Sequence, residues 1–219
     1  GTGTATAAIG GAGDGNAPGQ IGEFDGSSWT TTPNLGINGY QMHFVGTQTA
    51  AVGAGAYYDS GAWEWNNVSW TASGAAMPVH CFGTSCVGTA SDGSWIAGTR
   101  VSPPAAQSIR QDYNGTSWTV GTAVPVTGSP GGGCSNSSPT DDCWVAGLTG
   151  SPASTAGTYQ WDSSSWTTSG NMGTGRTNGA AGGTSRYNGF IAGGHSGTYP
   201  SATEEFSGNV SVVETITTS

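Results

Sequence analysis

The chain has 219 residues, of which 40 are glycine, and a formal net charge of −9, with charged side chains at only 8% of positions. It carries four arginines and no lysine, so it lacks the positive patch that binding to nucleic acid or to an anionic membrane surface requires. No apolar run approaches the ~20 residues that span a bilayer. We therefore expect one well-buried domain, with no nucleic-acid partner and no membrane insertion.

A short pattern of residues recurs five times along the chain. Each copy begins with a small aliphatic cluster, and these clusters are Ile9–Gly11, Val52–Ala54, Ile96–Gly98, Val145–Gly147 and Ile191–Gly193. About fifteen residues later comes an aromatic residue, and these aromatics are Phe24, Trp65, Tyr113, Trp161 and Phe206. Successive aromatics lie 41, 48, 48 and 45 residues apart. A repeat of this length, made of short strands, is typical of the blades of a β-propeller.

Each repeat is predicted to form four short antiparallel strands. The aliphatic cluster lies on the second strand, where small residues let the backbone approach the propeller axis. The aromatic lies on the third strand, and a turn such as Asn114-Gly115 leads into the fourth. In four repeats the fourth strand begins with Ser-Trp-Thr, and its tryptophans are Trp29, Trp70, Trp118 and Trp166. The sequence thus predicts an all-β, five-bladed propeller, with repeats at 1–36, 37–77, 78–126, 127–172 and 173–219.

Both ends of the chain depart from this pattern. Residues 1–3 are too few to supply a first strand, so only four first strands can be counted. In the fifth repeat Ser211 stands where tryptophan is expected, and a β-forming tail follows at 212–218. We predict that this C-terminal strand closes the ring by pairing with the first blade, which would remove an exposed sheet edge. Because the sequence begins at Gly1 without methionine, we also expect a processed chain or a piece of a longer polypeptide.

The four cysteines form two close pairs. Cys81 and Cys86 flank a Phe-Gly-Thr-Ser turn, and Cys134 and Cys143 bracket a polar segment. Neither pair has the two-residue gap typical of zinc knuckles, and no histidine completes a set. We favour two hairpin disulfides, Cys81–Cys86 and Cys134–Cys143, which would indicate an oxidising, extracellular setting. Four free thiols and the crossed pairing are the alternatives.

The aromatic residues divide into a repeated set and a non-repeated set. The four tryptophans recur at the same place in each blade, as packing between blades demands, so we assign them to the core and not to sugar-stacking platforms. Sugar binding typically combines an exposed aromatic ring with nearby polar groups, which the non-repeated residues can offer. The candidate ligand-binding residues are Tyr57, Tyr58, Asp59, Trp63 and Tyr199. Capping of a blade is the alternative role for these residues.

We expect no catalytic residues, no metal and no cofactor. The chain has no Ser/His/Asp order with a nucleophile elbow. A sialidase-like site would need clustered arginines, whereas the four arginines here are scattered. The segments Asp14-Gly15-Asn16 and Asp141-Asp142 offer oxygen ligands of the kind that Ca²⁺ prefers, but neither supplies a full set. The protein is therefore predicted not to be an enzyme.

The repeats resemble those of kelch-like propellers, which share the glycine-rich cluster, the aromatic before a tight turn and the later tryptophan. A closer resemblance is to repeats of virion and appendage proteins in tailed phages (cyanophages and marine phages), through EFDGSSWTT, DYNGTSWTV and QWDSSSWTTSGNMGTGR. This resemblance implies a non-enzymatic protein on the virion surface, in a tail fibre, a spike or a capsid decoration. Its implied role is host adhesion, with other virion proteins or host surface glycans as partners.

Two other functions fit the same sequence. One is a secreted carbohydrate-binding propeller of the lectin type, with glycans held at blade loops. The other is a structural subunit of an extracellular filament or coat. A homo-oligomer is compatible with all three functions.

Overall fold

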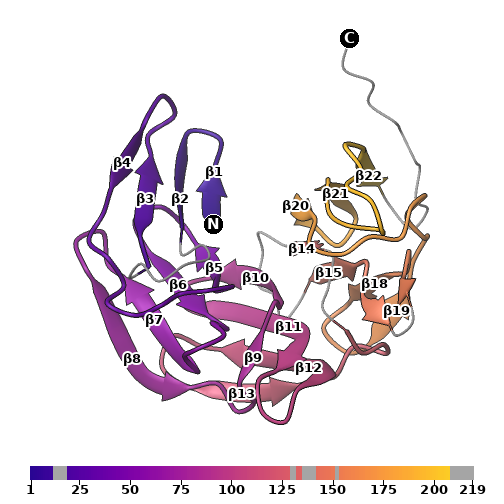
Figure 1. Ribbon diagram of the computed structural model, residues 1–219, viewed down its shortest axis with the longest axis horizontal. Coiled ribbons are helices and arrows are strands. Elements are labelled where there is room, and N and C mark those ends of the chain that lie inside the picture. Colours follow the sequence, from indigo (N-terminus) through magenta and orange to yellow (C-terminus); the bar gives the residue numbers. More distant parts are fainter. Residues whose placement is uncertain (12–18, 129–131, 135–141, 151–152, 208–219) are drawn as a thin grey trace.

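The computed structural model describes residues 1–11, 19–128, 132–134, 142–150 and 153–207, and for 132–134, 149–150 and 153–154 it describes the backbone alone. Within these residues the chain forms strands, turns and links, and its sheets stand as five blades around a central axis (Figure 1). The protein is an all-β, five-bladed β-propeller, as the repeat length predicts. The described part of the chain contains no helix that could cross a membrane.

Blades 1 and 2 are four-stranded antiparallel sheets whose strands follow chain order. Blade 1 contains β1 (Thr2–Thr4), β2 (Ala7–Gly11), β3 (Ile21–Phe24) and β4 (Trp29–Thr31). Blade 2 contains β5 (His43–Gly46), β6 (Ala51–Ala54), β7 (Gly61–Trp65) and β8 (Trp70–Ala76).

Blades 3, 4 and 5 vary this plan. Blade 3 contains β10 (Ser85–Thr89), β11 (Asp92–Arg100), β12 (Ala105–Tyr113) and β13 (Trp118–Gly121), and the short β9 (Cys81–Phe82) also pairs with β11. Blade 4 contains β14 (Gly132–Cys134), β15 (Cys143–Ala146), β18 (Thr158–Trp161) and β19 (Trp166–Thr168), with a small hairpin of β16 (Thr149–Gly150) and β17 (Ala153–Ser154) in one loop. The described part of blade 5 contains β20 (Ala180–Ser185), β21 (Asn188–Ala192) and β22 (Thr203–Ser207).

The first strand of blade 1 corrects one prediction. Residues 2–4 do form this strand, because a tight turn lets Thr2 pair with Ile9 and Thr4 pair with Ala7. Strands β1, β5, β10, β14 and β20 line the axis, and each contacts the next (Figure 1). The inner position of blade 1 is therefore already occupied. The tail at 212–218, which was expected to close the ring by pairing with the first blade, lies outside the described residues.

The core consists of layers between neighbouring blades. Side chains alternate along each strand, so every blade has one face toward the preceding blade and one toward the following blade. On the first face, each third-strand aromatic lies opposite the fourth-strand tryptophan, as in Trp65 and Trp70, and the ring centroids of the four such pairs are 4.9 to 5.4 Å apart. These rings pack on aliphatic side chains of the preceding blade, such as Ile9 and Ile21. Burial of each large apolar side chain stabilises the ring by roughly 1.5–3 kcal/mol.

At two positions the residue just before a third-strand aromatic makes a polar contact with the next blade: Glu64 bonds to Tyr113, and Gln160 Nε2 donates to the carbonyl oxygen of Arg186. Alternation places that residue on the opposite sheet face, toward the next blade. Tyr113 donates its hydroxyl to Glu64 of blade 2 at 2.5 Å, and burial together with this hydrogen bond raises the pKa of Tyr113. In blade 3, Arg110 donates Nε to Asp112 at 2.7 Å, and its guanidinium lies 4.7 Å from the ring centroid of Trp161 in blade 4. These contacts fix the register of one blade against the next.

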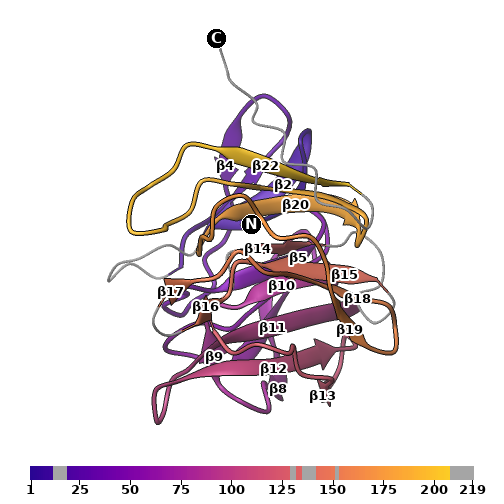
Figure 2. The same ribbon diagram turned by 90° about the vertical axis from the view of Figure 1, so that its right-hand side faces the viewer.

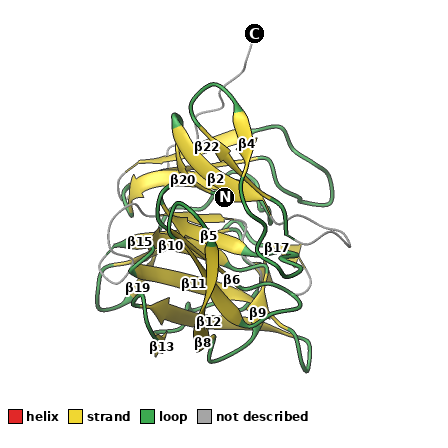
Figure 3. Cartoon of the chain, turned by 90° about the vertical axis from the view of Figure 1, so that its left-hand side faces the viewer, coloured by secondary structure: helices red, strands yellow, loops and turns green. Residues whose placement is uncertain are grey.

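The two ends of the strands form two different faces of the ring (Figure 2, Figure 3). The turn face carries the tight turns between the first and second strands and between the third and fourth strands of each blade. The link face carries the loops between the second and third strands and the links from one blade to the next. Backbone hydrogen bonds tie neighbouring links and loops together on that face, as from Tyr57 N to Tyr40 O at 2.9 Å and from Val101 N to His80 O at 3.0 Å.

The turn face is regular. Its four equivalent turns are each held by one Asp or Asn that accepts backbone N–H bonds from the residues two and three positions later, and these residues are Asp25, Asn66, Asn114 and Asp162. Hydrogen bonds from the Ser28 and Ser27 amides lower the pKa of Asp25 to about 2. Hydrogen bonds from the Ser164 hydroxyl and nearby amides lower the pKa of Asp162 to about 2.

The predicted Cys81–Cys86 disulfide is absent from the structure. Cys81 pairs with Arg100 and Cys86 pairs with Trp95, both on β11, so the two cysteines lie along one edge of that strand and not across a hairpin. Five residues of extended strand separate these positions by ~16 Å, whereas a disulfide needs Cα atoms within ~7 Å. Cys81 is a buried free thiol, and burial raises its pKa to about 11.

The other cysteines have different surroundings. Cys86 Sγ donates a hydrogen bond to the carbonyl oxygen of Phe44 at 3.2 Å. The backbone of Cys134 pairs with Trp144, next to Cys143. The Cys134 side chain lies outside the described part of the chain, so the Cys134–Cys143 disulfide stays a prediction.

Candidate functional site

An aromatic group on the link face contains two of the candidate residues. We call Tyr40, Tyr57, Tyr58 and Phe82 the tyrosine cluster. The ring of Tyr57 lies 4.8 Å from those of both Tyr58 and Phe82, and the ring of Tyr40 lies 6.0 Å from Tyr57. Tyr58 is 64% exposed, while the other three rings are half-buried beneath it. The cluster thus presents one tyrosine ring on an aromatic base, a geometry typical of binding surfaces.

Three separate segments build this cluster. Tyr57 and Tyr58 lie in the loop between β6 and β7, Tyr40 lies in the link from blade 1, and Phe82 lies on β9 of blade 3. His80, in the adjacent link, makes a 2.8 Å hydrogen bond between its Nε2 and the carbonyl oxygen of Ala56. Long-range backbone pairing brings these segments together, so the positions of Tyr40 and Phe82 could not be read from local sequence.

Asp59 and Trp63, two further candidate residues, make contacts within the protein. Asp59 Oδ1 accepts the Gly61 backbone N–H at 2.5 Å, so this oxygen supports the loop itself. Trp63 lies on β7 opposite Ala72 and packs against the core layer between blades 1 and 2. The structure therefore brings Tyr57 and Tyr58 together, but it places Trp63 in the packing between blades.

Tyr199 stands apart from the tyrosine cluster, in the blade 5 loop between β21 and β22. It lines an open hollow on the link face, and we call this the blade-5 hollow, formed by Asn178, Gly194, His195 and Tyr199. Tyr199 is 86% exposed, and its ring centroid lies 5.1 Å from that of His195. The link face therefore carries two aromatic sites on different blades.

A buried ion pair lies beneath the blade-5 hollow. Arg176 is fully buried, and its Nη2 donates to Glu204 on β22. Its Nη1 donates to the carbonyl oxygens of Gly193 and Ala202, at 3.1 and 2.8 Å. Those two residues are the ends of the loop that carries Tyr199, so one guanidinium holds both ends. Removal of one partner of such a buried pair is strongly destabilising, because it leaves an uncompensated buried charge.

The repeat tryptophans are not equivalent. Trp70 is buried, Trp118 and Trp166 are half-buried between blades, and Trp29 is 60% exposed. The expectation of four core tryptophans therefore fails for Trp29. Its sheet face turns away from blade 2, toward the side on which blade 5 stands (Figure 1). In blades 2 to 4 the corresponding face packs on the preceding blade.

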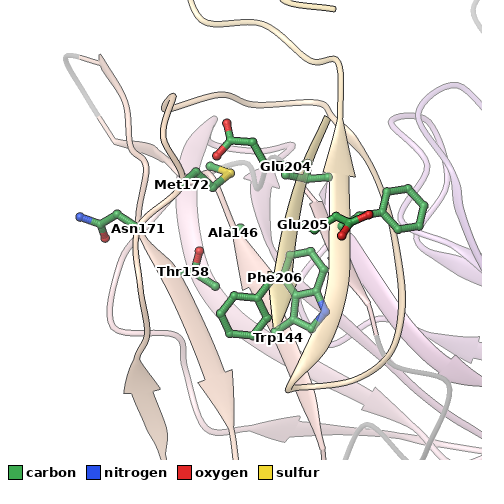
Figure 4. Close-up of a pocket in the computed structure, with 10 residues that line it drawn as sticks. Trp144, Ala146, Thr158, Asn171, Met172, Glu204, Glu205 and Phe206 are labelled. Atoms are coloured by element: carbon green, nitrogen blue, oxygen red, sulfur yellow. The ribbon is translucent and has the colours of Figure 1, made fainter. Parts of the chain in front are cut away.

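A small pocket of about 20 Å³ lies between blades 4 and 5. Figure 4 shows Trp144 and Phe206 beside each other at one end of it and Met172 near Glu204 at the other. In other blades a fourth-strand tryptophan packs beside the residue that corresponds to Phe206, whereas this repeat has Ser211 at that position. Glu204 is already bonded to Arg176 and to the amides of Gly173 and Thr174. This pocket is therefore part of the packing between blades.

Two segments of the chain carry the candidate calcium ligands. Asp14, Asn16 and Asp141 lie outside the described residues, and Asp142 Oδ1 accepts the Arg186 backbone N–H at 2.7 Å. In the described ranges no group of three His, Cys, Asp or Glu side chains is placed to hold a metal ion.

Comparison with known proteins bears on the fold. No family model matches the chain, and no curated protein matches it. Among solved structures, the chain is similar to "Structure of YjhT", with a TM-score of 0.69, 12% sequence identity, and coverage of 90% of this chain and 79% of that chain. At this identity the similarity shows a shared propeller fold and nothing further.

Proposed function

We propose that this protein is a non-enzymatic attachment protein on the surface of a phage virion, and that it binds a host surface through its link face. The observation that carries the proposal is the placement of two exposed tyrosines, Tyr58 at 64% and Tyr199 at 86%, on loops of the same face. Exposed tyrosine rings supply large, rigid contact area with a polar tip, which suits recognition surfaces.

The division between the two faces supports this proposal. The turn face repeats nearly the same Asp/Asn turn from blade to blade, whereas the loops of the link face differ in length and sequence. Binding residues are found disproportionately on variable loops that a rigid scaffold positions. The inter-blade layers and the inner ring of strands provide that scaffold.

The virion assignment comes from the sequence motifs. The segments EFDGSSWTT and DYNGTSWTV form the end of the third strand, the turn and all or most of the fourth strand in blades 1 and 3. Their resemblance to repeats of tailed-phage proteins concerns the framework of the propeller. The link face, which does not repeat, would then determine which surface is bound.

Two linked measurements test the proposal. Mass spectrometry of purified virions should detect this chain at a fixed copy number, and that number would distinguish a fibre from a capsid decoration. Purified protein, added to host cells before infection, should reduce virion adsorption in a dose-dependent way. Absence of the chain from virions, together with unchanged adsorption at saturating protein, would contradict the proposal.

A further inference from the structure

The blade-5 hollow has an exposed aromatic ring in a defined position. Tyr199, at 86% exposure, is the most exposed large apolar side chain in the described residues. Its ring is inclined at 59° to the ring of His195, with centroids 5.1 Å apart. His195 is itself held by reciprocal backbone hydrogen bonds with Thr177, of 3.0 and 2.8 Å. The ring of Tyr199 therefore packs against a residue, His195, whose backbone is held in place.

Arg176 holds both ends of the loop between β21 and β22, which carries Tyr199. Arg176 donates to the carbonyl oxygens of Gly193 and Ala202 and to the carboxylate of Glu204, with no exposed surface of its own. Hydrogen bonds to a charged donor in a buried site are shorter and stronger than neutral ones. Both ends of the loop are already held in place. Binding of a ligand to Tyr199 therefore costs less conformational entropy, because less of the loop has to become ordered.

The opposite side of the hollow carries Asn178. Its backbone has a φ of 56°, in the left-handed region that asparagine adopts more readily than most other residues apart from glycine. The exposed side chain of Asn178 offers an amide donor and acceptor across from the tyrosine ring.

Charge and size limit what can bind there. The hollow has a volume of about 430 Å³, and its lining includes neither an arginine nor a carboxylate. That size is within the range of small-molecule sites, which combine an aromatic surface with a few polar groups. The net charge of −9 and the absence of lysine disfavour an anionic ligand.

From these observations we infer that the blade-5 hollow binds one pyranose ring of a neutral saccharide. The C–H groups on one side of the sugar pack against the face of Tyr199, whose π-electrons carry partial negative charge. Asn178 and His195 hydrogen-bond the hydroxyl groups at the rim. This inference rests on the proposed role of the link face in surface binding, and it names the chemistry for one part of that face.

Saturation-transfer NMR with the full chain tests this site. The probes are the methyl glycosides of glucose, galactose, mannose and N-acetylglucosamine, with sialyllactose as the anionic comparison. We expect transfer to the ring protons of at least one neutral probe, and loss of that transfer in Tyr199→Ser. The variant Asn178→Gly should weaken binding of the same probe about tenfold while leaving the melting temperature unchanged or higher, because glycine accepts the positive φ.

A matched variant on the turn face serves as the control. Tyr187→Ser removes an exposed tyrosine ring from the turn between β20 and β21 and should leave saccharide binding unchanged. The inference is overturned by an absence of transfer from every neutral probe at millimolar concentration, by transfer from sialyllactose alone, or by transfer that survives Tyr199→Ser. If adsorption to host cells is retained in any of these cases, the proposed function stands and only the saccharide assignment fails.

Discussion

The repeated framework and the link face of this propeller differ in what their residues contact. In the framework, the same kinds of residues recur at the same places: an aromatic pair on one sheet face, aliphatic residues on the other, and an Asp or Asn in the turn. On the link face, each loop is different, and the contacts join segments from different blades. Most residues that recur from blade to blade serve packing, with the exposed Trp29 as an exception, whereas a residue found once can pack between blades, as Trp63 does, or stand exposed on a loop, as Tyr58 does.

Trp70 and Trp29 occupy the same position in two blades but have different surroundings. Trp70 is 8% exposed against blade 1, while Trp29 is 60% exposed. We expect Trp70→Ala to lower the free energy of unfolding by about 3–5 kcal/mol, because it empties a packed layer. Trp29→Ala should cost about 1 kcal/mol or less. Urea unfolding of the two variants measures both values.

If Trp70→Ala and Trp29→Ala lower the free energy of unfolding by the same amount, Trp29 is buried in solution as well. In that case blade 5 would cover the face of blade 1 that carries Trp29. The comparison between the two tryptophans is thus also a test of how the ring is completed.

At acid pH we expect the turn face to have a smaller effect on the stability of the folded protein. The folded-state pKa values of Asp25 and Asp162 are about 2, below the usual value of about 4. Each carboxylate therefore adds stability above about pH 4 that is lost as the pH falls toward about 2. Replacing both by asparagine should preserve the turns, as Asn66 and Asn114 do in blades 2 and 3, and should reduce the acid-dependent loss.

Thermal unfolding of this double variant between neutral and acid pH measures the difference from the native protein. At neutral pH the two proteins should unfold at nearly the same temperature. An unchanged acid dependence in the variant would mean that groups other than Asp25 and Asp162 determine it.

The sequence predicts the framework well because framework contacts follow local rules. Strand alternation, the Asp-Gly and Asn-Gly turns and the aromatic spacing all lie within one repeat, so they identify five blades without knowledge of the tertiary structure. The inner strand of blade 1 was missed because three residues are too few to show a pattern. The Cys81–Cys86 pairing was inferred from spacing, and it does not form because both residues pair with the same edge of β11.

The candidate site was only partly predictable. Tyr57, Tyr58 and Tyr199 stand out as aromatics that do not repeat, and all three lie on the link face. Trp63 was indistinguishable from them by that criterion, although alternation along β7 turns it toward blade 1. The contributions of Phe82 and Arg176 depend on contacts between distant segments, for which one sequence contains no local signal.

In our account the link face binds the host surface, whereas the turn face belongs to the scaffold and makes no contact with the host. Two double variants test it directly: Tyr58→Ser with Tyr199→Ser on the link face, and Val68→Ser with Tyr187→Ser on the turn face. All four side chains are exposed in the native protein. Adsorption of each purified variant to host cells should fall about tenfold or more for the link-face pair, as loss of binding hot spots implies, and should stay unchanged for the turn-face pair. Equal adsorption by both variants, or a greater loss from the turn-face pair, would contradict this division.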